Sequence, residues 1–298
     1  MGCKRRGIAA LLAAVSLLWC LTGCGQILYG EKVELSGELS GKLTMTGSTS
    51  MTKVCQALGE AFQEKYPGVV TEKSGTGSGE APQAVLNGTA LLGDLSRDLR
   101  EEEHPEAFEQ LLVAIDGIAL AVSRENPVQG LTSEQVSRIF RGEITNWKEV
   151  GGEDLPITLL GRESSSGTRD GFESLFGVEG CSYDAELTST GEVVTRISSD
   201  PGAIGYVSLE SLNDSVRGLA IDGAEPTEEN IIAGTYQVQR PFLQVYKKGT
   251  DSRLVAAWVE FVESDEGQQV IEQAGLIPSG RMQEPSPAAQ SGTQAEGE

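Results

Sequence analysis

Short runs of β-branched and other apolar residues alternate with helical patterns through the middle of this chain. The predicted strands cover residues 42–46, 69–73, 111–115, 118–123, 157–160, 203–208 and 242–246. Apolar residues at helical spacing follow the first strand, from Met51 to Phe62, and recur from Leu254 to Val262. This alternation predicts an α/β sheet with helices on both faces. About 240 residues can form one large domain or two lobes, and the pattern alone does not choose between them.

The N-terminus has the features of an export signal. Residues 4–6 are basic, and residues 8–19 form an uncharged apolar stretch, shorter than the roughly 20 residues that cross a bilayer. Residues 21–24 (Leu-Thr-Gly-Cys) resemble a bacterial lipobox, in which the chain is cleaved before the cysteine and lipid is attached to its sulfur. We therefore expect a signal peptide at residues 1–23 and a lipid on Cys24 that anchors the protein outside the cell membrane. The alternative is an ordinary secretory signal with a chance cysteine.

Polar segments flank the predicted folded part, which covers about residues 42–282. Residues 24–41 are rich in Gly and predict a tether, and residues 283–298 have the composition of a disordered tail. After removal of the signal, Cys55 and Cys181 are the cysteines left without lipid. A disulfide between them is possible in an oxidising compartment, but two thiols make no framework and we expect no bond.

The chain is strongly acidic. Its formal net charge is −21, and becomes −24 when the three basic residues of the signal are removed. This charge argues against nucleic acid as a partner, because nucleic-acid binding needs a basic surface. It does not exclude a site for a small anion, because salt screens net charge within about 8–10 Å and local donors then decide binding.

Three segments place small hydroxyl residues and glycines between a predicted strand and a predicted helix. They are residues 46–50 (Thr-Gly-Ser-Thr-Ser), 74–79 (Ser-Gly-Thr-Gly-Ser-Gly) and 162–168 (Arg-Glu-Ser-Ser-Ser-Gly-Thr). A helix start offers unpaired backbone N–H groups and a partial positive charge, and glycine lets an anion approach closely. Convergence of such junctions, with Arg162 in one of them, predicts a site for a tetrahedral oxyanion. Any single junction can instead be an ordinary helix cap.

The order of these motifs resembles the substrate-binding protein of the phosphate ABC transporter, in the form found in Gram-positive bacteria. Besides the three junctions, the resemblance includes residues 95–99 (Leu-Ser-Arg-Asp-Leu), 142–147 (Gly-Glu-Ile-Thr-Asn-Trp) and 201–206 (Pro-Gly-Ala-Ile-Gly-Tyr). It covers about residues 42–278, and the Arg-x₃-Ser-Gly-Thr spacing is its most specific element.

This resemblance implies a type II periplasmic-binding-protein fold, with two α/β lobes and the ligand in the cleft between them. Lobe 1 would comprise residues 42–117 and 240–282, and lobe 2 residues 118–239. Two crossover strands would pass near residues 116–123 and 238–246. The implied function is delivery of inorganic phosphate to a membrane permease by a monomer that needs no cofactor or metal and is not an enzyme.

The resemblance also implies which residues hold the ligand. The expected phosphate-binding residues are Ser48, Thr49, Ser50, Thr76, Ser78, Ser96, Arg162, Ser166, Gly167 and Thr168. Phosphate keeps a proton at neutral pH and sulfate does not, so an acceptor in the site can select phosphate. Well-studied members use an Asp where this chain has Ser96, and Asp94 is the alternative acceptor. Discrimination against sulfate, or another oxyanion, therefore stays open.

Two further residues have alternative interpretations. Arg169 either touches the anion or pairs with Asp170 or Glu173 on its own helix. His104 is the only histidine of the chain and lies in a charged stretch, which predicts a surface position. A single histidine excludes a His-rich metal site and leaves no histidine base for a serine hydrolase or phosphatase built on residues 164–166. A phosphate sensor without transport remains an alternative function.

Overall fold

The computed structural model describes residues 38–281. The expected signal peptide, Cys24 and the tail from residue 283 lie outside these residues. Leu39 is buried and the first strand begins at Ser40, so regular structure starts within the segment expected to be the tether. In the described part of the chain, no helix combines the length and apolar character that a membrane span requires.

The described elements form two lobes. The first lobe contains β1 (Ser40–Gly47), α1 (Thr52–Lys65), β2 (Gly68–Gly75), η1 (Ser78–Glu80), α2 (Ala81–Leu86), β3 (Leu92–Leu95), η2 (Glu101–Glu103), η3 (Pro105–Ala107), α7 (Arg253–Glu263), α8 (Asp265–Gln273), β12 (Ile277–Pro278) and η6 (Ser279–Arg281). The second lobe contains β5 (Gly130–Leu131), α3 (Ser133–Phe140), η4 (Trp147–Val150), β6 (Thr158–Arg162), α4 (Gly167–Phe176), β7 (Ala185–Leu187), α5 (Thr190–Ser199), β8 (Ala203–Ser208), η5 (Leu209–Ser211), β9 (Val216–Gly218), β10 (Ala220–Ile221) and α6 (Glu228–Ile232). The two-lobed α/β arrangement expected from the sequence is confirmed.

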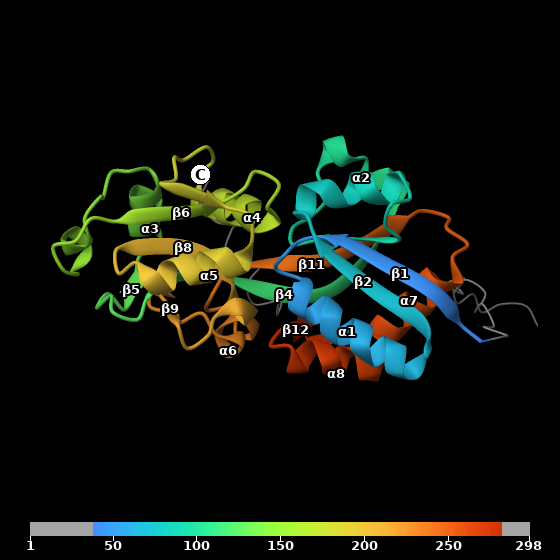
Figure 1. Ribbon diagram of the computed structural model, residues 1–298. Helices are drawn as coiled ribbons and strands as arrows, with labels where there is room; N and C mark the ends of the chain where they lie inside the picture. The colour runs from blue at the N-terminus through green and yellow to red at the C-terminus, as the bar shows by residue number, and fades with distance from the viewer. Residues whose placement is uncertain (1–37, 282–298) are drawn as a thin grey trace, which may run out of the picture. The chain divides into compact units, whose positions relative to one another are not determined.

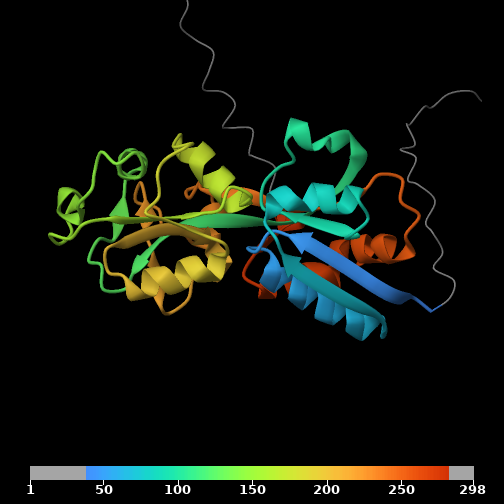
Figure 2. The ribbon, with the colours of Figure 1, turned by 45° about the horizontal axis from the view of Figure 1, so that its top comes forward.

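Two long strands join the lobes. β4 (Phe108–Ser123) pairs antiparallel with β11 (Gln239–Lys247) up to Gly117 and with β8 from Ile118 onward. The sheet order β2-β1-β3-β11-β4-β8-β6-β7 therefore runs from one lobe into the other. Figure 1 and Figure 2 show the long strand β4 extending between the two lobes. The runs predicted at residues 111–115 and 118–123 belong to one strand, because the polar pair Asp116-Gly117 between them continues the ladder. Strand β3 was not predicted, since Leu92–Leu95 is short and contains Gly and Asp.

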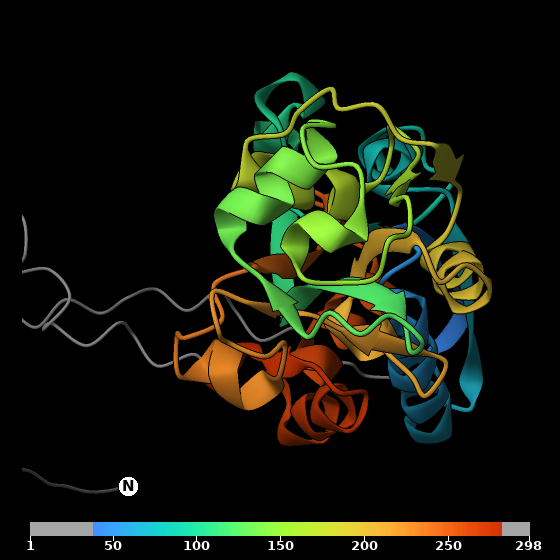
Figure 3. The ribbon, with the colours of Figure 1, turned by 90° about the vertical axis from the view of Figure 1, so that its left-hand side faces the viewer.

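Alternation along β4 divides the core of the second lobe into two layers. Ile118, Leu120 and Val122 face the helices α3 and α4, whereas Ala119 and Ala121 face α5. Successive side chains of a strand point to opposite faces, so one strand supplies both layers. Figure 3 shows α3 and α5 on opposite sides of these strands. Helices thus cover both faces of the sheet, as the strand–helix alternation predicts.

A buried ion pair joins the two linking strands. Asp116 of β4 lies opposite Arg240 of β11, and Arg240 Nη2 is 2.9 Å from Asp116 Oδ2. Ser208 donates a hydrogen bond of 2.7 Å to the other carboxylate oxygen. Burial raises the pKa of Asp116, and the neighbouring guanidinium of Arg240 opposes that shift. Asp116 thus links β4 both to β11, through Arg240, and to the last residue of β8, Ser208.

A second buried carboxylate, Glu210 in η5, lies close to this pair. Its side chain is 3% exposed and its Oε2 lies 3.4 Å from Lys53 Nζ of α1. Burial raises its pKa to about 7, and the negative charge of Asp116 adds to the shift. The positive charge of Lys53 opposes this rise in the pKa. Glu210 therefore carries a proton in the folded state over a pH range in which it would be ionised in the unfolded chain.

We predict that Glu210 makes stability fall with rising pH. Its folded pKa exceeds its unfolded value, so the folded state binds the extra proton between about pH 4.5 and pH 7 and loses up to about 3 kcal/mol over that window. Glu210→Gln cannot titrate and should lose less stability there, and urea unfolding at pH 5 and pH 8 measures both. An equal difference between the variant and the unchanged protein at the two pH values would contradict the assignment.

Candidate functional site

The three hydroxyl-rich junctions differ in how their helices begin. α1 follows the first junction with Met51 as its N-cap, and η1 follows the second with Gly77, and neither has a side-chain cap. α4 follows the third junction, and the hydroxyl of its N-cap Ser166 accepts from the backbone N–H of Arg169 at 3.3 Å. Capping therefore explains Ser166 and leaves the hydroxyls of the other two junctions without that role.

The three junctions meet around one small cavity. Its lining residues are Ser48, Thr49, Ser50, Gly77, Ser78, Arg162, Ser166, Gly167 and Thr168, and protein atoms leave about 120 Å³ between them unfilled, part of it open to solvent. Because the lining side chains leave so little room, the cavity suits a small ion better than an organic ligand. Every lining residue is one that can donate a hydrogen bond from its side chain or its backbone N–H.

Contacts between the lobes close this cavity. Ser50 Oγ of the first lobe lies 2.9 Å from Thr168 Oγ1 of the second, and both residues are buried. The backbone N–H of Gly79 donates to the carbonyl of Ser165 across the same boundary at 2.9 Å. A Cβ on Gly167 would lie 2.6 Å from Ser78 Oγ, so this position requires glycine. The structure is therefore that of the closed protein.

Arg162 provides the guanidinium of the cavity. It is 2% exposed, and its Nη1 and Nη2 donate to the hydroxyls of Thr190 and Thr49, each at 3.1 Å. Glu163 accepts from Nε at 2.9 Å and from Nη2 at 2.7 Å. This bidentate pairing compensates the charge of Arg162 within the protein. The cavity thus combines many donors with little net positive charge.

Thr190 is a residue of this site that the sequence did not predict. It is the first residue of α5, it is 4% exposed, and its Oγ1 lies 3.1 Å from Ser50 Oγ. Residues 188–191 (Thr-Ser-Thr-Gly) follow the short strand β7 and include the N-cap Ser189 and the first two residues of α5. This is the design of the other three junctions. The sequence did not reveal this junction because β7 has only three residues, which are too few to show the pattern of a strand.

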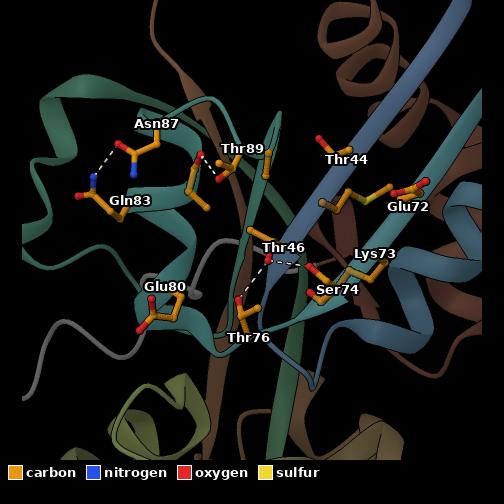
Figure 4. Close-up of a pocket in the computed structure, with 13 residues that line it drawn as sticks. Thr44, Thr46, Glu72, Lys73, Ser74, Thr76, Glu80, Gln83, Asn87 and Thr89 are labelled. Atoms are coloured by element: carbon orange, nitrogen blue, oxygen red, sulfur yellow. Dashed lines mark hydrogen bonds between the residues drawn. The ribbon is translucent and has the colours of Figure 1, made fainter.

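The structure does not bring Thr76 to the cavity. Its side chain is exposed, and its Oγ1 lies 3.1 Å from Thr46 Oγ1, to which Ser74 also donates at 2.8 Å. Figure 4 shows these three hydroxyls in a separate surface pocket between the strands and α2. The turn at Gly77 is the reason: its φ of 93° redirects the chain into η1, and Ser78 at the start of η1 lines the cavity.

The two candidate acceptors, Ser96 and Asp94, separate in the structure. Ser96 Oγ lies 3.2 Å from Ser78 Oγ and next to Gly167, at the edge of the cavity. The carboxylate of Asp94 is fully buried and does not line the cavity, and Lys73 Nζ lies 3.1 Å away from it while Gln244 donates to it at 2.8 Å. Alternation would put both residues on one face, but β3 ends at Leu95 and the chain turns there. The structure therefore places Ser96, and not the carboxylate of Asp94, beside the cavity.

Asp94 acts on the site through the backbone instead. Its carbonyl accepts from the N–H of Ser48 at 2.8 Å, and Lys73 Nζ donates to the carbonyl of Ser48 at 3.0 Å. The backbone N–H and the backbone carbonyl of Ser48 are thus both held by the Lys73–Asp94 pair. Burial raises the pKa of Asp94, and Lys73 opposes the shift.

Arg169 also lies behind the site and not in it. Its guanidinium donates to Glu173 at 2.7 Å, to Glu186 at 2.8 Å and to the carbonyl of Arg162 at 2.8 Å. The interpretation of Arg169 as a partner of Glu173 is thus confirmed, and its third bond holds the Arg162 backbone. His104 is exposed and lies 3.4 Å from Glu106. Among residues 38–281, no group of three or more His, Cys, Asp and Glu residues is placed to hold a metal ion.

Two lobes that close on a buried, donor-rich cavity define the periplasmic-binding-protein fold, and comparisons with known proteins agree. A family profile described as "PBP superfamily domain" matches residues 32–266. The Phosphate-binding protein PstS of Bacillus subtilis is 30% identical, over 92% of this chain and 95% of that protein. The Phosphate-binding protein PstS of Pseudomonas aeruginosa is 32% identical, over 80% of this chain and 84% of that protein.

Solved structures give the same result. A putative phosphate ABC transporter substrate-binding protein with bound phosphate, from Clostridium perfringens, has a TM-score of 0.78 and 36% identity. The alignment covers 80% of this chain and 99% of that one. An ABC-type phosphate transport receptor from Vibrio cholerae has a TM-score of 0.66 and 33% identity, over 79% and 99% of the two chains. This chain belongs to the PBP superfamily and, within it, to the PstS family.

We predict that the Lys73–Asp94 pair is important for stability. Asp94→Ala leaves the ammonium of Lys73, which is 3% exposed, without its charge partner, and should cost about 3–5 kcal/mol of unfolding free energy. Glu72→Ala is the matched control, because it breaks the exposed pair with Lys42 and should cost less than about 1 kcal/mol. Urea unfolding of both variants measures the difference, and equal small losses would contradict the prediction.

Proposed function

We propose that the protein binds inorganic phosphate in this cavity, outside the cytoplasm, and delivers it to the permease of an ABC transporter. The closed cavity of hydroxyl and backbone donors around Arg162 is the observation that carries the proposal. Relatives named for phosphate binding support it, as does the similar Clostridium perfringens structure, whose name records bound phosphate.

The chemistry of the cavity suits a tetrahedral oxyanion. Hydroxyls of Ser48, Ser50, Ser78, Ser96, Ser166 and Thr168 would donate to its oxygens, and the guanidinium of Arg162 would share its charge. The start of α4 adds the backbone N–H groups of Gly167 and Thr168 and the positive end of the helix dipole. Thr49 and Thr190 would orient Arg162 through their hydroxyls. Binding needs no turnover, and we propose that the protein is not an enzyme.

Selection of phosphate over sulfate would depend on Ser96. Its hydroxyl can accept a hydrogen bond from the protonated oxygen of phosphate, and it can also donate to an ionised oxygen. A hydroxyl does not repel sulfate as a carboxylate does. The serine at this position therefore favours, as a second candidate, a site that also accepts sulfate-like oxyanions.

Titration calorimetry of the mature chain with phosphate tests the proposal. The same titration of Arg162→Ala tests whether the ligand binds in this cavity. Loss of the buried guanidinium should weaken phosphate binding by at least about 2 kcal/mol, or roughly 30-fold in Kd. Arg138→Ala in the same lobe is the control, because Arg138 is an exposed partner of Glu143 and should leave Kd unchanged. Absence of heat from folded protein would refute phosphate binding. Heat with sulfate as well as with phosphate would establish the second candidate.

We further propose that a lipid on Cys24 anchors the protein and that the protein is a monomer. We propose that its first lobe comprises residues 42–117 and 240–282 and its second lobe residues 118–239. The lipobox-like residues 21–24 support the anchor. Labelled palmitate should enter the unchanged protein and not Cys24→Ala, which should leave the membrane fraction and appear in the medium. Labelling of both proteins, or of neither, would refute the anchor on this residue.

A further inference from the structure

We propose that Asp170, which does not line the cavity, sets the affinity for the ligand by latching the two lobes together through Arg97 and Arg100. This inference rests on the proposed oxyanion-binding function of the cavity. We call the three residues, together with Glu103, the latch.

The latch is built from both lobes. Asp170 lies in the first turn of α4 in the second lobe, and Arg97 and Arg100 follow β3 in the first lobe. One carboxylate oxygen of Asp170 accepts from Arg97 Nε at 2.7 Å and from Arg100 Nη2 at 2.5 Å. Separation of the lobes would therefore break two charge-assisted hydrogen bonds at once.

The first lobe holds its half of the latch in place. Glu103 accepts from Arg97 Nη1 at 2.8 Å and from Nη2 at 2.6 Å, and Arg97 Nη1 also donates to the carbonyl of Asp98 at 2.8 Å. Arg97 has a side chain only 8% exposed, against 24% for Asp170. A guanidinium fixed in this way loses little side-chain entropy when Asp170 arrives, and its burial strengthens the attraction. The latch is thus preorganised for closure.

The latch adjoins the cavity on both sides. Arg97 comes directly after Ser96, and Asp170 comes two residues after Thr168, which lines the cavity. The elements that bring the cavity walls together therefore also bring the latch together. Neither Arg97 nor Asp170 lines the cavity, so the latch acts on the closure and not on the ligand.

The charge of the cavity explains why affinity would depend on such a contact. Glu163 already pairs with Arg162, so an entering anion finds donors but no unpaired cation. Closure must then be supported by contacts between the lobes, such as Ser50–Thr168 and the latch. The Lys53–Glu210 pair also bridges the lobes, but its separation is 3.4 Å. The apparent Kd rises as the closed fraction falls, so a weaker latch weakens binding.

Asp170→Asn in the mature chain tests the latch. The variant keeps the shape of the side chain and removes its charge, so the Kd for inorganic phosphate should rise about tenfold, mostly through faster dissociation. Added NaCl should weaken binding to the unchanged protein more than binding to the variant, because salt screens the latch. Asp170→Glu restores the charge and should recover part of the affinity. Calorimetry gives Kd, and stopped-flow measurements give the dissociation rate.

Asp154→Asn is the matched control, since Asp154 pairs with Lys148 within the second lobe and at its surface. It should leave Kd and the dissociation rate unchanged. Arg100→Gln removes one of the two charge-assisted hydrogen bonds to Asp170, and Arg100 is exposed. This variant replaces Asp170→Asn in the test if Asp170→Asn fails to fold. Folded latch variants with the Kd, dissociation rate and salt dependence of the unchanged protein would overturn the proposal.

Failure of the proposed function is a separate outcome. If the unchanged folded protein binds no phosphate, a pair of dyes, one on each lobe, still measures the open fraction without ligand. Asp170→Asn should then increase the open fraction, and Asp154→Asn should not. An unchanged open fraction in Asp170→Asn would overturn the latch as well.

Discussion

The antiparallel pairing of β4 with β11 is the constraint on which the rest of the structure depends. These two strands link the lobes, and β4 continues from its pairing with β11 in the first lobe into its pairing with β8 in the second. Backbone polar groups at such a crossing need partners, and the buried pair of Asp116 and Arg240 adds a charged tie at the same place. Because the chain passes between the lobes along these two strands, we expect a change in the separation of the lobes to bend the chain there.

Compensated charge is the common property of the site and its surroundings. Arg162 pairs with Glu163, Lys73 pairs with Asp94, and Arg97 pairs with Glu103. An acidic protein can bind an anion under these conditions, because hydroxyls and backbone N–H groups supply local donors and the long-range field is screened. Glycine at position 167 completes the arrangement, since it lets the two walls approach without a side chain between them.

Prediction from the sequence succeeded where a pattern acts locally. Strand–helix junctions with surplus hydroxyls are readable because helix starts and tight turns have their own residue preferences. Ser78 and Arg162 were named in this way, and the structure puts both at the cavity. The same reasoning could not separate Thr76 from Ser78, because the direction of a side chain in a loop depends on contacts made elsewhere. It missed Thr190, because β7 is too short to show a period.

The sequence by itself determined the α/β class, the family and the junctions that hold donors, because these depend on spacing and local propensity. Only the tertiary structure decided which donors meet. The carbonyl of Asp94 accepts a hydrogen bond from the backbone of Ser48, and Asp170 faces Arg97 across the lobes. Residues 73 positions apart, as Arg97 and Asp170 are, come into contact through the path of the whole chain. No local pattern records that path, since it follows from how β4 and β11 join the two lobes.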